Sequence, residues 1–173
     1  YLAEAAALAT HATDPALRQQ ARHRALAALR HALGSHRVGW FDAEDGRRWG
    51  RSWISVLGLE RAGAAIDLLA DDLDPRHRDL LDAVLIDEAD HLADSHERNG
   101  HPGIRGGRWD HEGLNWPESN LWNGCHLWRT AQRIPDHPHV EHWRERAVRF
   151  LLNAVSVPSD ATSTAVVDQR VVG

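Results

Sequence analysis

The feature that most constrains this chain is a pair of signals that recur sixty residues apart. Asp14-Pro15 recurs as Asp74-Pro75, and Arg48-Trp49 recurs as Arg108-Trp109. Asp followed by Pro is typical of a helix start, because the carboxylate can cap the first N–H groups and Pro has no N–H to leave unpaired. Recurrence at a fixed interval predicts a repeated structural unit.

A looser third copy of the first signal, Asp136-His137-Pro138, extends the repeat toward the end of the chain. Each copy is followed by a helix-like run and preceded by another, and Leu81, Leu85 and Leu92 show the one-sided apolar spacing of a helix. We therefore predict an all-α fold of repeated α-hairpins that occupies residues 1–173 as one domain. The hairpins are expected at about 1–33, 51–98 and 118–155.

The composition excludes several kinds of chemistry. The chain has no Lys, so it cannot form a Schiff base with a substrate or build a Lys-containing phosphate loop. A single Cys excludes an intrachain disulfide and a zinc site made of several Cys residues. The net charge of -5 and the lack of a basic stretch argue against a nucleic-acid partner.

No apolar run approaches the roughly 20 residues that are needed to span a bilayer, so we expect a soluble protein without a membrane partner. The first residues, YLAEAAALATHATDP, have the pattern of a helix already under way, and the chain stops at DQRVVG without a terminator. We interpret it as an internal fragment. A missing signal peptide then leaves the compartment open between the bacterial cytoplasm and secretion.

The richest stretch is GGRWDHEGLNWPESNLWNG, residues 106 to 124, in a predicted long loop and the start of the next helix. Trp offers a flat apolar face and one N–H, which suits the C–H-rich face of a sugar beside its hydroxyls. Long loops also need bulky anchors, and this packing role is the alternative. Of the eight Trp residues, seven lie in the long loops or on the helices that follow them: Trp40, Trp49, Trp53, Trp109, Trp116, Trp122 and Trp128.

WPESNLWNGCHLW, the PDHP turn and HVEHWRERAVRFLLN resemble bacterial members of the (α/α) toroid group of carbohydrate metabolism. This group contains the six-hairpin glycosidase-like proteins and polysaccharide lyases. The resemblance implies a glycoside hydrolase or polysaccharide lyase acting on an oligo- or polysaccharide, without a metal or cofactor. It places the cleft at the N-terminal ends of the inner helices. A full toroid of this group has about six hairpins, so this chain would supply roughly half of one and missing sequence the rest.

On this interpretation the candidate catalytic residues are Asp110, His111, Glu112 and Glu118. In a hydrolase, Asp110 or Glu112 would protonate the leaving oxygen while Glu118 stabilises charge or activates water. In a lyase, His111, or a Tyr that this segment lacks, would remove the proton next to a uronate carboxylate. Glu118 follows a Pro at a helix start, where a carboxylate is also a good partner for the helix dipole.

The candidate substrate-binding residues are aromatic, amide and basic side chains of the same regions. In the lyase version Arg108 and Asn120 would help to neutralise the uronate carboxylate. We expect Trp128, ten residues into its helix, to belong to the core. The rival hypothesis is a non-catalytic helical-repeat module that binds a glycan or a protein. The full substrate-binding set is Trp49, Arg108, Trp109, Trp116, Asn120 and Trp122.

Overall fold

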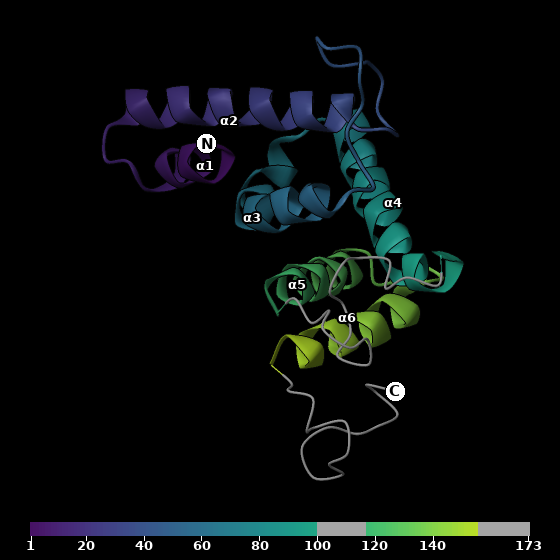
Figure 1. The fold of residues 1–173 in the computed structure, drawn as a ribbon. Helices are drawn as coiled ribbons and strands as arrows, with labels where there is room; N and C mark the ends of the chain where they lie inside the picture. The colour runs from purple at the N-terminus through teal and green to yellow at the C-terminus, as the bar shows by residue number, and fades with distance from the viewer. Residues whose placement is uncertain (100–116, 156–173) are drawn as a thin grey trace. The chain divides into compact units, whose positions relative to one another are not determined.

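The computed structural model describes residues 1–99 and 117–155, and this part of the chain is helical (Figure 1). The all-α prediction is confirmed, and closure of the helices into a toroid stays a prediction. Within the described residues, His36 and Trp49 form an isolated parallel β-bridge. The helices are α1 (Leu2–His11), α2 (Pro15–Ser35), α3 (Trp53–Leu69), the short 3-10 helix η1 (Ala70–Asp72), α4 (Pro75–Asn99), α5 (Pro117–Arg133) and α6 (Val140–Val155).

Two of the Asp-Pro pairs stand at helix starts. The Asp14 carboxylate accepts a hydrogen bond from the Ala16 N–H at 2.8 Å, and α2 begins at the Pro that follows it. At α4 the Asp74 carboxylate accepts one from the His77 N–H at 3.1 Å. These bonds satisfy N–H groups that have no partner inside a helix. They show that the recurring signal sets where α2 and α4 begin.

The chain divides into two compact units, and α3 and α4 each contribute to both. Unit 1 comprises Tyr1–Gly50 and Arg61–Asp87, and unit 2 comprises Arg51–Glu60 and the described residues from Glu88 onward. None of the helices in the described ranges is long and apolar enough to cross a membrane.

In unit 1, α1 and α2 pack against each other (Figure 1). Ala6 of α1 and Ala25 of α2 are both fully buried. The loop that follows α2 is closed at its base, where the Arg37 N–H donates to the Trp49 carbonyl at 2.8 Å and the Trp49 N–H donates to the Ser35 carbonyl at 3.3 Å. The two ends of the long loop are therefore hydrogen-bonded to each other.

In unit 2, α5 and α6 form a closely packed pair. Gly124 allows this approach, because a Cβ atom there would lie 2.6 Å from Leu151 Cγ and 3.0 Å from the Ala147 carbonyl oxygen. Trp143 of α6 is fully buried, and its indole N–H donates to the Asp90 carboxylate of α4. The α6 side of α5 is therefore core, while Glu118, Leu121 and Trp128 of the same helix are exposed.

Candidate functional site

A row of three side chains runs along α5 from the protein surface into its interior. Glu118 is exposed, Trp122 is half-buried, and His126 is buried at 3% exposure. They are spaced four residues apart, which places consecutive members on the same side of a helix. Glu118 lies in the first turn, where its negative charge is favoured by the positive end of the helix dipole. We call these three residues the Glu118 row.

Trp122 combines an accessible ring with an enclosed polar atom. Its indole N–H is buried and has no hydrogen-bond partner within the described ranges. The Asn123 amide and the Thr130 hydroxyl, both on fully buried residues of α5, also lack partners there. Leaving a buried polar group unpaired costs about 1–3 kcal/mol. Native proteins keep few such groups, and those that persist often serve a ligand, ion or water.

The predicted substrate-binding residue Asn120 is fully buried on the same helix. It lies two residues after Glu118, which corresponds to about 200° around the helix axis. The structure therefore brings Trp122, but not Asn120, onto the side of α5 that carries Glu118. A contact of Asn120 with substrate stays a prediction.

The predicted substrate-binding residue Trp49 belongs to unit 1, where it fixes the base of the loop after α2. Its indole N–H donates to the Ala32 carbonyl at 2.8 Å, and its ring meets the His36 ring edge-on at a centroid distance of 4.5 Å. These contacts are those of a packing anchor, the alternative that the sequence left open for the loop tryptophans. A substrate contact by Trp49 stays a prediction.

The other candidate residues lie outside the described part of the chain, so their proposed roles also remain predictions. They are the catalytic candidates Asp110, His111 and Glu112 and the substrate-binding candidates Arg108, Trp109 and Trp116.

The prediction that Trp128 belongs to the core is wrong, because 40% of this residue is exposed. The neighbouring Leu127 is fully buried and takes the core position instead. His126 was not predicted as a site residue from the sequence. Its signal was the spacing of four residues from Trp122 and eight from Glu118, which puts a titratable ring at the inner end of the row.

The Glu118 row does not fit a metal ion. Glu118 and His126 are its only usual metal ligands, and eight residues separate them by about 12 Å along a helix. In unit 1, a His36 ring nitrogen and an Asp87 carboxylate oxygen lie within 4.8 Å of each other. The Arg37 guanidinium binds the Asp87 carboxylate at 2.5 Å, and this positive charge disfavours a metal cation at the same oxygen.

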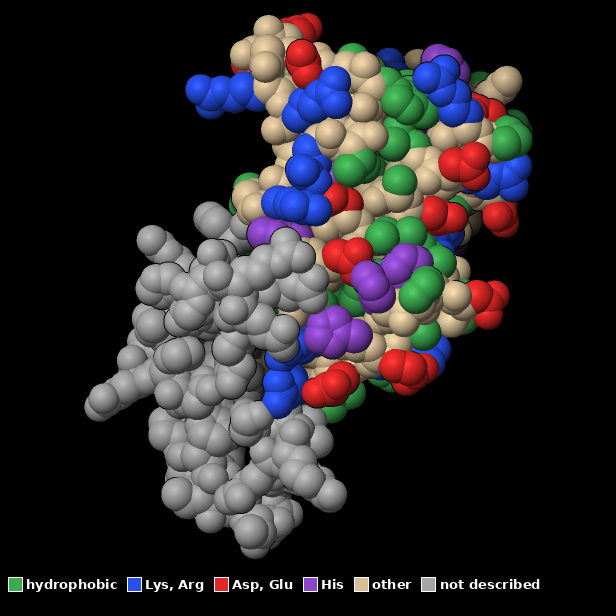
Figure 2. Space-filling model, turned by 90° about the vertical axis from the view of Figure 1, so that its right-hand side faces the viewer, with side chains coloured by type: hydrophobic (Ala, Val, Ile, Leu, Met, Phe, Trp, Pro, Cys, Tyr) green, Lys and Arg blue, Asp and Glu red, His purple; other side chains and the backbone are tan. Residues whose placement is uncertain are grey.

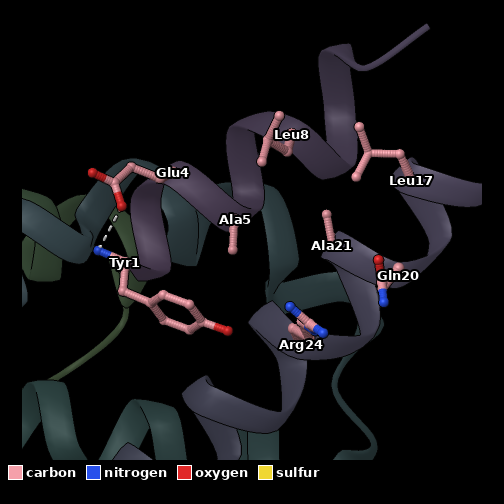
Figure 3. A pocket seen from close by; sticks show the side chains of 8 residues that line it. All are labelled: Tyr1, Glu4, Ala5, Leu8, Leu17, Gln20, Ala21 and Arg24. Atoms are coloured by element: carbon pink, nitrogen blue, oxygen red, sulfur yellow. Dashed lines mark ion pairs between the residues drawn. The ribbon is translucent and has the colours of Figure 1, made fainter. Parts of the chain in front are cut away.

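A hollow lies between α1 and α2 of unit 1 (Figure 3). Its volume is about 200 Å³, and its walls are mainly apolar. Ligand pockets usually add a few convergent polar groups to an apolar wall. The polar side chains that line this groove, Glu4, Gln20 and Arg24, are exposed to solvent (Figure 3). The groove is therefore a weaker candidate than the Glu118 row. It is lined by Tyr1, Glu4, Ala5, Leu8, Leu17, Gln20, Ala21 and Arg24.

The charges of the described residues do not gather into a basic surface on the face drawn in Figure 2, where acidic and basic side chains alternate.

Comparison of the chain with known protein families, with characterised proteins and with solved structures finds no match. The interpretation of the site therefore depends on its own chemistry.

Proposed function

We propose that the chain is part of a carbohydrate-active enzyme, a glycoside hydrolase or polysaccharide lyase, in which the Glu118 row contacts the glycan. The observation that carries the proposal is the state of Trp122, which has a partly exposed ring and an enclosed N–H without a partner in the described part of the chain. A sugar presents an apolar C–H face beside hydroxyl oxygens that accept hydrogen bonds. The C–H face matches the exposed part of the ring, and a hydroxyl would satisfy the N–H where binding opens access to it.

Glu118 supplies the charge of the proposed site. A carboxylate one helical turn before Trp122 can accept hydrogen bonds from sugar hydroxyls and can stabilise positive charge at the reacting carbon. Glycoside hydrolysis uses two carboxyl groups about 5 to 9.5 Å apart. In the hydrolase version Asp110 or Glu112 supplies the second carboxyl group, and in the lyase version His111 supplies the base.

The second candidate function is a non-catalytic module that binds a glycan. It is favoured by the Glu118 row itself, which carries one carboxylate where hydrolysis uses two. Both functions need the same contact with Trp122. They differ in whether removal of the charge at position 118 affects turnover.

The proposal is tested by calorimetric titration of the intact protein with a panel of neutral and acidic oligosaccharides. We expect Trp122→Phe, which keeps a ring and loses the N–H, to weaken binding by about tenfold. Trp122→Ala should weaken it further. Trp128→Ala is the matched control, because it removes an exposed Trp from the same helix but from a different side. Binding by Trp122→Ala that equals the wild type would overturn the proposal.

The two candidate functions are separated by Glu118→Gln, which changes the charge and keeps the shape. In an enzyme that uses this carboxylate we expect at least about a hundredfold loss of turnover with glycan binding retained. Full turnover by this variant would assign catalysis to other residues. Glycan binding without turnover by the wild type would favour the non-catalytic module.

A further inference from the structure

A second side of α5 exposes apolar residues to solvent. Leu121 is 53% exposed and Trp128 is 40% exposed, and the half-buried Cys125 lies between them. The spacing of four and then three residues puts all three on one side of the helix, which is the pattern of a helix that packs against another helix. We call Leu121, Cys125 and Trp128 the outer face.

Charged residues border the outer face. Glu118 and Arg129 are both exposed, and their separation of eleven positions amounts to just over three full turns of the helix. They therefore lie along the same edge of the outer face, the acidic one near the start of α5 and the basic one nearer its end. A helix with this arrangement is complementary in charge to a reversed copy of itself.

We propose that the outer face binds the outer face of a second copy of this chain, with the two α5 helices antiparallel. In a two-fold dimer, residue i of one copy contacts residue j of the other, and j contacts i. Leu121 then lies opposite Trp128 of the second copy, and Glu118 lies opposite Arg129 of the second copy. This interaction leaves Trp122 outside the paired residues, but it shares Glu118 with the proposed glycan site.

The register of the two pairings supports a single axis. The midpoint between Leu121 and Trp128 falls between Gly124 and Cys125, and the midpoint between Glu118 and Arg129 falls one residue earlier. One residue corresponds to about 1.5 Å along a helix, so one two-fold axis serves both pairs. In a parallel two-fold pair, the Glu118 and Arg129 side chains of the two copies would lie on opposite edges of the interface, so neither charge would meet its counterpart.

Cys125 provides a direct probe, because it is the only Cys in the chain and lies next to the proposed axis. Burial raises the pKa of its thiol, the negative charge of Glu60 raises it further, and the positive charge of Arg129 opposes the rise. Because the thiolate is the reactive form, crosslinking with a short bis-maleimide is best done at mildly alkaline pH. Peptide mapping should find the crosslink between two copies of Cys125.

The decisive test is analytical ultracentrifugation of the intact protein over a range of concentrations. We expect a monomer–dimer equilibrium in the wild type, weakened at least about tenfold by Trp128→Ala. Arg129→Glu should weaken it by bringing two acidic groups together. The double variant Glu118→Arg, Arg129→Glu should restore it, a result that general loss of stability cannot produce. Circular dichroism checks that each variant is folded.

Trp122→Ala is the matched control for dimer formation, as Trp128→Ala is for glycan binding. Dimerisation that survives Trp122→Ala while glycan binding fails would separate the two proposals. A wild type that stays monomeric at all concentrations would overturn the dimer. So would a dimer that is insensitive to Trp128→Ala and to Arg129→Glu, or a failure of the charge exchange to restore association.

Discussion

The indole N–H of Trp143 donates a hydrogen bond to the Asp90 carboxylate at 2.9 Å. Trp143 is fully buried on α6, and Asp90 belongs to α4, so the bond joins two helices inside unit 2. The same carboxylate oxygen lies 2.9 Å from His139 Nδ1, just before α6 begins. Asp90 thereby connects α4 both to α6 and to the turn that precedes it.

Trp143→Leu should destabilise unit 2 more than Trp143→Phe does. Phe keeps most of the buried aromatic volume and removes the N–H, for which we expect a loss of about 1–3 kcal/mol in the free energy of unfolding. Leu also leaves part of the cavity unfilled. Urea titrations of the two variants and the wild type measure the differences. Equal stability of Trp143→Phe and the wild type would show that the bond to Asp90 contributes little.

The Asp74 cap of α4 predicts a loss of stability in acid. The side-chain hydrogen bond with His77, followed by the backbone N–H of the same residue, lowers the pKa of the Asp74 carboxyl. Its folded-state pKa is thus below that of the unfolded chain. The contribution is present above the unfolded pKa of about 4 and disappears as the pH falls through the folded pKa. Asp74→Asn, which can still cap a helix but does not titrate, should show a smaller fall in Tm below pH 4. Parallel curves of Tm against pH for the two proteins would contradict this.

Two helical glycines should respond to alanine in opposite ways. A Cβ at Gly124 would lie 2.6 Å from Leu151 Cγ, so Gly124→Ala should push α5 and α6 apart and cost about 1–3 kcal/mol. A Cβ at Gly58 would meet nothing within 4 Å, so Gly58→Ala should stabilise α3 by about 0.5–1 kcal/mol. Chemical denaturation measures both. If Gly124→Ala is as stable as the wild type, the described packing of α5 on α6 is wrong.

The thiol of Cys125 should react slowly with alkylating agents. Its raised pKa reduces the thiolate fraction at neutral pH, so its rate profile should lie at higher pH than that of a free cysteine. Arg129→Gln removes the charge that opposes this rise and should move the profile further upward. The rates are measured at low protein concentration, so that dimerisation does not shield the thiol. A profile equal to that of free cysteine would contradict the burial of Cys125.

The starts of α2 and α4 were predictable because helix capping is local. Asp14 and Asp74 bind N–H groups two and three residues away, and Pro15 and Pro75 fit the first helical position without losing a hydrogen bond. The class of fold follows from such local signals. Packing is not local, and for that reason Trp128 was misplaced: Leu127, one residue earlier, fills the core position and turns the Trp to the surface.

The candidate site was predictable only in part. Glu118 and Trp122 were selected for their chemistry, and their spacing of one helical turn also places them in one row. Asn120 was selected for the same chemistry, yet it is buried on another side of α5. Chemistry identifies candidate residues, but the helix period and the position of the core decide which of them share a surface.

The central claim is that a glycan binds at the Glu118 row through Trp122. Calorimetric titration of the intact protein with the oligosaccharide panel tests it most directly, with wild type, Trp122→Ala and Trp128→Ala compared on the best ligand. The account predicts that Trp122→Ala loses most of the affinity and Trp128→Ala keeps it. A wild type that binds no oligosaccharide, or a Trp122→Ala variant that binds as tightly as the wild type, would contradict it.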